Sequence, residues 1–193
     1  MICSWALSGD SGVQCYGMVV LCRYRQNVTK GDSKLTEQEV IRHYYSGLVG
    51  WLELRASAHG VRSISFIPQP AVPETSRTNA IMEQLTDELD RYFAGNLTRF
   101  TVPLDPASGT PFQRVVWHGL TEIPYGETRS YAEVASAVGH PAAARAVGSA
   151  NRNNEIPILI PCHRVIKADG TLGGYASGLK IKKTLLELEG IAT

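Results

Sequence analysis

One apolar segment constrains the fold of this 193-residue chain more than any other. It reads Ile-Pro-Ile-Leu-Ile-Pro-Cys-His-Arg-Val-Ile over residues 156–166. The run is too short for a helix and is bounded by prolines, so we predict a buried extended segment. It carries Cys162 into the interior and presents it at a break in the chain, beside His163.

The Cys162–His163 pair suggests a nucleophile next to its base. Cysteine reacts as the thiolate, and an unperturbed thiol with a pKa of about 8.5 is barely ionised at neutral pH. A neighbouring imidazole can take the proton, directly or through one water. Buried cysteines are more often inert packing, and adjacent residues on a regular strand point to opposite faces. The pair therefore cooperates only if the chain bends there.

The charge of the chain does not identify a nucleic-acid partner. The net charge is +1, and the composition is that of an ordinary globular protein. Residues 1–40 have no net charge, residues 41–108 carry −1 and residues 109–193 carry +2. The C-terminal part is thus the only basic one, and only weakly so.

The four cysteines favour a reducing, intracellular compartment. If Cys162 works as a thiolate, an odd number remains, which argues against a disulfide framework. A zinc site built from Cys3, Cys15 and Cys22 with a histidine stays open, although the spacings lack the usual Cys-x-x-Cys knuckle. We expect no membrane span and no signal peptide.

The sequence divides into an extension and two domains. Residues 1–40 form an extension of unknown role, with an expected strand over 15–24 and a helix start at 36–39. Residues 41–105 predict a small α/β domain, because apolar and polar side chains alternate over 52–56 and 63–66 around a His59-Gly60 turn. This hairpin begins at residues 43–45. A helix over 79–93 follows, with these residues on one apolar face: Ile81, Leu85, Leu89 and Tyr92.

Residues 106–193 predict a mainly helical domain after a turn-rich linker. The first helix begins at Thr110-Pro111 and is broken at 124–126. The second covers 130–138 and opens with a capping box. The third starts near Pro141 and runs through Val147, and Gly139 turns the chain between the two in a helix-turn-helix pattern. One face of the third helix is nearly all alanine, which suits a narrow groove better than a core.

Several motifs in the right order resemble one family. They are Gly126–Tyr131, Ala143–Gly148, Pro161–Val165 and Glu189-Gly190. From about residue 50 to 190 the chain resembles the O6-alkylguanine-DNA alkyltransferases, or methylated-DNA–protein-cysteine methyltransferases, whose active-site signature is Pro-Cys-His-Arg-Val. The resemblance implies an α+β fold, in which a ribonuclease-H-like α/β domain (41–105) precedes a mainly helical, winged helix-turn-helix-like domain (106–193).

The resemblance implies a catalytic role for four residues. Cys162 attacks the alkyl carbon of O6-alkylguanine, and His163 takes the thiol proton through a water. Glu189 orients the imidazole and stabilises its charge. The Tyr131 hydroxyl donates to guanine N3, on the leaving group.

The resemblance also implies a DNA-binding surface on the third helix. The target nucleotide must leave the base stack to reach a buried thiol. Arg145 matches the arginine that takes its place in the stack, and Asn154 matches the asparagine that holds the turn before the active-site segment. The positions facing the minor groove are Ala143, Ala144, Ala146 and Gly148.

The implied substrate pocket uses backbone groups and one aromatic ring. The Val165 carbonyl accepts from the guanine amino group, Tyr175 forms the aromatic wall, and the Ala176 N–H donates to O6. Ala176 replaces a serine found in some members. Many members have tryptophan at Thr184 and histidine at Leu188, so the packing behind Glu189 differs here.

The implied function is DNA repair by direct damage reversal in a single turnover, because the S-alkylcysteine product cannot be cleaved. We expect no cofactor and no metal, and a monomer that acts on double-stranded DNA in the cytoplasm, at the nucleoid, or in a nucleus. Activity on O4-alkylthymine and the preference among alkyl groups stay open.

Three alternatives stand beside this function. A non-catalytic, alkyltransferase-like DNA-damage-binding protein shares the pocket but replaces the reactive cysteine, and Cys162 argues against it. A thiol hydrolase usually brings its histidine from far along the chain. A methylation-sensing transcriptional regulator carries an additional zinc domain, for which residues 1–40 are too short.

Overall fold

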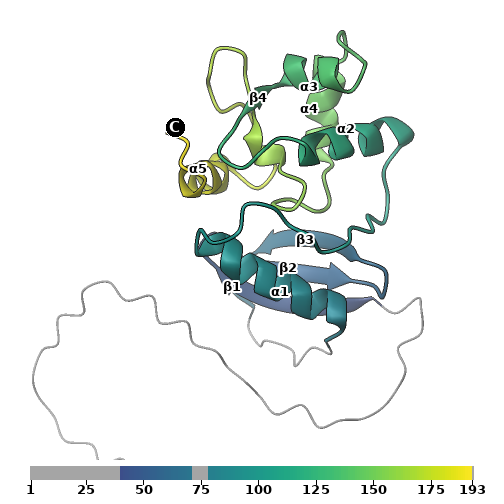
Figure 1. The fold of residues 1–193 in the computed structure, drawn as a ribbon, viewed down its shortest axis with the longest axis vertical. Helices are drawn as coiled ribbons and strands as arrows, with labels where there is room; N and C mark the ends of the chain where they lie inside the picture. Colours follow the sequence, from purple (N-terminus) through teal and green to yellow (C-terminus); the bar gives the residue numbers. More distant parts are fainter. Residues whose placement is uncertain (1–39, 71–77, 193) are drawn as a thin grey trace, which may run out of the picture. The chain divides into compact units, whose positions relative to one another are not determined.

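The computed structural model describes residues 40–70 and 78–192 (Figure 1). The strand and helix expected within residues 15–39, and the three cysteines weighed for zinc, lie outside the described residues. Within them the chain has the predicted α+β fold, a small sheet with one helix followed by a mainly helical region.

The first region is a three-stranded antiparallel sheet in the order β1-β2-β3. The strands are β1 (Ile41–Gly47), β2 (Gly50–Ala56) and β3 (Val61–Ile67). The alternation expected over residues 52–56 is present, because Leu52, Leu54 and Ala56 are fully buried. Strand β1 extends beyond the expected 43–45 on both sides and pairs with β2 along its whole length.

Helix α1 (Ala80–Phe93) lies along one face of this sheet (Figure 1). The Asn79 side chain caps it by accepting from the Met82 N–H at 2.8 Å. Three residues of its predicted apolar face, Leu85, Leu89 and Tyr92, are fully buried. In the first turn Ile81 is only partly buried, and Met82, which was not predicted, is fully buried instead. The sheet and this face of α1 therefore form one core.

The second region begins with helix α2 (Pro111–Thr121) and continues through two short helices. These are α3 (Tyr131–Ala137) and α4 (Ala144–Arg152), which pack against each other as a helix-turn-helix pair. Capping boxes start both α2 and α3. A 3-10 turn, η1 (Cys162–Arg164), follows α4, and the last helix is α5 (Leu179–Leu188). A two-stranded parallel sheet joins β4 (Arg129–Ser130) to β5 (Val165–Ile166).

Two expected elements differ in the structure. Helix α4 begins at Ala144 rather than near Pro141, because residues 141–142 form a turn, and it continues five residues past Val147 to Arg152. The expectation of an extended segment over 156–160 is wrong. These residues are buried, but they form a compact turn closed by a bond from the Ile160 N–H to the Ile156 carbonyl at 3.0 Å.

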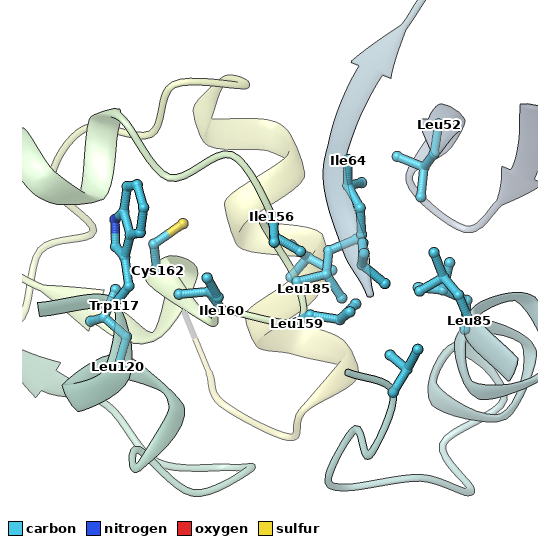
Figure 2. Close-up of a cluster of buried hydrophobic side chains, with 14 of the residues drawn as sticks. Leu52, Ile64, Leu85, Trp117, Leu120, Ile156, Leu159, Ile160, Cys162 and Leu185 are labelled. Atoms are coloured by element: carbon cyan, nitrogen blue, oxygen red, sulfur yellow. The ribbon is translucent and has the colours of Figure 1, made fainter. Parts of the chain in front are cut away.

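The apolar segment joins the cores of the two regions. Ile156, Ile158 and Leu159 belong to one continuous cluster with side chains of the sheet, α1 and α2. Figure 2 shows Ile156, Leu159 and Ile160 between Cys162 and the side chains of Ile64 and Leu85. A backbone bond from the Ile64 N–H to the Glu155 carbonyl, 2.9 Å, fixes the segment to β3. Cys162 is thus anchored from both regions.

Candidate active site

The chain bends at Cys162, as cooperation with His163 requires. The 3-10 turn η1 is formed by the Arg164 N–H, which donates to the Pro161 carbonyl at 3.0 Å. Cys162 is 6% exposed and His163 is fully buried. Directly after the turn, β5 pairs with β4, whose Ser130 caps α3. This pairing places the first residue of α3, Tyr131, next to the active-site turn.

Asn154 holds the turn that leads to Cys162. Its side-chain N–H groups donate to the Ile160 carbonyl at 2.8 Å and to Cys162 Sγ at 3.1 Å. Its Oδ1 accepts from the Ile156 N–H at 3.0 Å. Between these bonds Ile158 takes a φ of +77°, which is unfavourable for a β-branched residue. The side chain of Asn154 therefore fixes both a strained backbone and the sulfur.

The Cys162 thiol has opposing influences on its pKa. Burial raises the pKa above its ordinary value and prevails. The hydrogen bond from Asn154, the nearby Tyr175 hydroxyl and the charge of Lys182 act in the other direction. The resting protein therefore holds a protonated thiol, and formation of the thiolate needs a base.

His163 has the geometry of that base. Its Nε2 lies 3.0 Å from Glu189 Oε1. Because a carboxylate only accepts, Nε2 carries the hydrogen and Nδ1 presents a lone pair. Among the described residues, Nδ1 is buried without a hydrogen-bond partner. Burial lowers the pKa of His163, with Arg164 and Lys182 adding to the effect and Glu189 opposing it. The imidazole is thus neutral and able to accept a proton.

Both carboxylate oxygens of Glu189 accept hydrogen bonds. Arg164 donates to Oε2 through Nε at 2.8 Å and to Oε1 through Nη2 at 2.9 Å. Burial alone would raise its pKa, but the bonds from His163 and Arg164 lower it to about 2. Glu189 is consequently ionised at neutral pH. Arg164 is itself held by the Ile123 carbonyl at 2.6 Å.

Three residues of the site were not predicted from the sequence. Arg164 pairs with Glu189, and Tyr92 of α1 donates to Glu189 Oε1 at 2.6 Å. Lys182 is fully buried, and its Nζ donates to the carbonyls of Val165 and Leu172. The signal for Lys182 was available, because a lysine interrupts the apolar face of α5 one turn before Leu185 and Leu186.

Lys182 also affects the predicted pocket. Burial lowers its pKa to about 8, and the proximity of Cys162 partly offsets this. Its Nζ occupies one of the two lone pairs of the Val165 carbonyl oxygen. The lysine therefore fixes the orientation of the carbonyl that the sequence singled out.

Tyr131 lies between two glycines of the pocket. A Cβ built on Gly148 of α4 would lie 3.7 Å from its ring, and one on Gly173 would lie 3.1 Å from its hydroxyl. Burial raises the pKa of Tyr131, and the nearby Cys162 adds to the shift. Tyr175 has a buried hydroxyl without a hydrogen-bond partner in the described chain, and Ala176 is exposed. Of these groups, Tyr131 and Tyr175 lie close enough to Cys162 to interact with it electrostatically.

Helix α4 presents its small side chains at different depths. Arg145 and Ala146 are exposed, whereas Ala143, Ala144 and Gly148 are partly buried. Ala143 provides no side-chain cap, so the first N–H groups of α4 have no side-chain acceptor there. The beginning of this helix therefore offers free donors, one arginine and no bulky side chain.

Within residues 40–70 and 78–192, no group of three or more histidine, cysteine or acidic side chains is placed to hold a metal ion. In the same ranges Cys162 is a free thiol. None of the helices described is both long and apolar enough to cross a membrane.

Two family models match successive parts of the chain. Residues 40–106 match the ribonuclease-like domain of 6-O-methylguanine DNA methyltransferase, and residues 111–191 match its DNA binding domain. Together they cover most of the chain and all of the active-site residues described above.

Curated proteins and solved structures agree with these matches. The methylated-DNA--protein-cysteine methyltransferase of Methanosarcina acetivorans is 47% identical over 146 residues, which is 74% of this chain and 93% of that protein. The protein of the same name from Mycobacterium leprae is 58% identical over 58% of this chain and 67% of its own. The crystal structure of Mycobacterium tuberculosis O6-methylguanine methyltransferase superposes with a TM-score of 0.70 at 43% identity, over 80% of this chain and 96% of that one. A structure of the M. tuberculosis protein in complex with DNA gives a TM-score of 0.69 at 43% identity, over 77% and 92%.

Proposed function

Since the chain belongs to the 6-O-methylguanine DNA methyltransferase family, we propose that it repairs DNA by moving the O6-alkyl group of guanine onto Cys162. The observation that carries this proposal is the geometry at the sulfur. A buried thiol is bonded to Asn154 and lies beside a neutral histidine that an ionised Glu189 orients. This is the arrangement that an activated sulfur nucleophile needs.

The proposed step is an in-line displacement at the alkyl carbon. Sγ of Cys162 forms a bond to that carbon while the bond from carbon to guanine O6 breaks. The thiol proton passes through a water to Nδ1 of His163, and Glu189 stabilises the imidazolium. The electron pair of the broken bond moves into the guanine ring, where the Tyr131 hydroxyl donates to N3. The guanine anion takes up one proton at N1 and the His163 imidazolium gives up the thiol proton, so the net change moves one proton from Cys162 to guanine and the charges balance.

Double-stranded DNA is the proposed partner. Because Cys162 is 6% exposed, a base in the stack cannot bring its O6 to the sulfur, so the nucleotide must be flipped out. Helix α4 fits the minor groove, because Arg145 and Ala146 are exposed and the helix start carries free N–H donors. Arg145 fills the space of the flipped nucleotide, while Val165, Tyr175 and Ala176 hold the extruded base.

Each molecule acts once in this proposal. The product is a thioether, and no group of the site can cleave it. The same chemistry extends to O4-alkylthymine, which also carries its alkyl group on an exocyclic oxygen. We expect the protein to act as a monomer beside chromosomal DNA, in a prokaryotic cytoplasm or a nucleus.

The test is a stoichiometry measured by mass spectrometry. The protein is mixed with a duplex that contains one O6-methylguanine, and the intact protein and its Cys162 peptide are weighed. We expect one methyl group on Cys162, saturation at one equivalent, and no transfer with Cys162→Ala. Tight binding of the duplex without modification of Cys162 would instead identify a non-catalytic damage-binding protein.

A further inference from the structure

The carboxylate of Glu189 receives a hydrogen bond from the first region of the chain. Tyr92 lies in α1, 97 residues before Glu189, and its hydroxyl donates to Oε1 at 2.6 Å. The same oxygen faces His163 Nε2 at 3.0 Å and Arg164 Nη2 at 2.9 Å. One atom of the relay is therefore shared by three donors, two from the active-site turn and one from helix α1.

Packing alone does not explain this tyrosine. Tyr92 is fully buried, and its ring contacts Phe93, Phe100 and Tyr125 at centroid distances of 5.4, 5.1 and 6.2 Å. A phenylalanine would make all of these ring contacts. The hydroxyl adds only the bond to Glu189. Burial, followed by the charge of Glu189 and the bond to it, raises the pKa of Tyr92 far above its ordinary value, so the hydroxyl remains a donor.

We propose that Tyr92 is a positioning residue for the alkyl transfer, which restrains Glu189 Oε1 and draws negative charge away from His163. This inference rests on the proposed function and extends it, because it gives the ribonuclease-like region a part in the chemistry. The hydrogen bond of Tyr92 goes to Glu189 and not to the sulfur, and its hydroxyl also lies close enough to Tyr175 to contribute to the raised pKa of that tyrosine. Tyr92 acts through Glu189 on the base.

The expected effect on His163 has a definite sign. The charged and titratable groups around His163 and its partner are Glu189, Arg164, Lys182, Cys162 and the hydroxyls of Tyr92 and Tyr125. Of these, only the Glu189 carboxylate favours the imidazolium. Without the Tyr92 hydroxyl, more of the charge on Oε1 faces Nε2, so the pKa of His163 rises. A base that is already protonated cannot accept the thiol proton.

The experiment compares Tyr92→Phe with the wild-type protein between pH 5.5 and 8.5. The first measurement is the rate of methyl transfer from an O6-methylguanine duplex. The second is the rate at which iodoacetamide alkylates Cys162 without DNA. In both measurements, we expect the acidic limb of the pH–rate profile to move to higher pH by about 0.5–1 unit. At pH values below the limb the rates then fall about three- to tenfold, while at pH 8 they change less than about twofold.

The matched control is Tyr45→Phe. Tyr45 is also a buried tyrosine of the first region and donates to a carboxylate, Asp90, at 2.8 Å, but it has no contact with the relay. Its variant should keep the wild-type pH profile. Equal losses at every pH in Tyr92→Phe, or an unchanged profile, would overturn the positioning role and leave a packing role.

A second variant covers the case in which Tyr92→Phe does not fold. Placing 3,5-difluorotyrosine at position 92 keeps the ring and strengthens the donor, so the acidic limb should move to lower pH. An unmoved or raised limb contradicts the inference. The iodoacetamide measurement needs no DNA, so it decides the role of Tyr92 even if the duplex is not demethylated and the proposed function fails.

Discussion

At Asn154, one carboxamide connects the backbone of the active-site turn to the sulfur. It bonds the Ile160 carbonyl, the Ile156 N–H and Cys162 Sγ. The bond to sulfur is the one that favours the reaction, because a hydrogen bond to the thiolate is stronger than one to the thiol. The other two keep the amide in place while the thiolate forms.

We expect Asn154→Ala to slow alkyl transfer about tenfold or more, since a bond to a charged group is worth about 1.5–3 kcal/mol. The pKa of the Cys162 thiol should rise as well, because one of the influences that lower it is removed. The pH dependence of iodoacetamide labelling measures this. Asn153→Ala serves as the control, because Asn153 is exposed, and a similar loss there would contradict the role of the amide.

Asn151 is a buried asparagine in the last turn of α4. Both polar atoms of its side chain are buried and have no hydrogen-bond partner among the described residues. An unpaired buried amide costs about 1–3 kcal/mol, and leucine is the better helix former. We expect Asn151→Leu to raise the free energy of unfolding by about 1–2 kcal/mol, measured by urea denaturation.

The comparison for Asn151→Leu is Asn153→Leu, at the exposed end of α4. A surface change of this kind should stay within about 0.5 kcal/mol. A loss of stability in Asn151→Leu would show that the amide is satisfied in solution.

At the scale of elements, the loop from Thr171 to Gly178 approaches the Tyr131 hydroxyl closely at Gly173. Gly173 has a φ of +67°, and a Cβ there would lie 3.1 Å from the Tyr131 hydroxyl and 3.4 Å from Lys167 Cγ. Alanine would be strained in this conformation by about 1–2 kcal/mol and would push against the hydroxyl. The loop can thus come this close only because it has no side chain at residue 173.

We expect Gly173→Ala to reduce the rate of methyl transfer about five- to tenfold, as the displaced Tyr131 hydroxyl loses part of a transition-state hydrogen bond. Single-turnover kinetics with the O6-methylguanine duplex measure the effect. Gly174→Ala is the control, because a Cβ at Gly174 would meet no atom within 4 Å. Equal rates for the two variants would contradict the role of the Tyr131 hydroxyl in methyl transfer.

The elements that local signals define could be predicted from the sequence. Helices α1, α2 and α3 follow from their apolar spacing and from capping residues such as Thr110 and Ser130. The turn over 156–160 could not be predicted, because five apolar residues in a row are typical of a strand. The side-chain amide of Asn154 holds these residues in a turn through its hydrogen bonds. The prolines also disfavour a strand, because they have no N–H to donate to a neighbouring strand.

Site residues that belong to a sequence motif could be predicted. Site residues that are brought in only by tertiary contacts could not. Cys162 and His163 adjoin in the sequence, so their chemistry could be derived directly. Tyr92 reads as one more apolar residue of a helix face, and its acceptor lies 97 residues away. Only the fold brings that hydroxyl to Glu189.

At the scale of the whole molecule, the low pKa of Glu189 links stability to pH. The carboxyl has a pKa of about 2 in the fold, against an ordinary value of 4.5. As the pH falls, the unfolded chain binds the proton first, so the contribution of Glu189 is complete above about pH 4.5 and is lost towards pH 2. Its size is on the order of 3 kcal/mol.

Thermal unfolding between pH 7 and pH 2.5 should show this loss. We expect Glu189→Gln to be less stable than wild type at pH 7 by about 3 kcal/mol, because Arg164 is left buried without a charged partner. The difference should shrink as the pH falls. Glu187→Gln, a change at an exposed side chain, should follow the wild-type curve, and a constant difference for Glu189→Gln would contradict the linkage.

The position of Glu189 also has a consequence for the order of folding. Its carboxylate meets His163 across 26 residues and Tyr92 across 97, so these contacts form late, after local helices and turns. Until they form, His163 has no oriented partner, and the thiol is no more reactive than that of any free cysteine. A protein that can react only once therefore completes the proton relay that activates its nucleophile only in the native state.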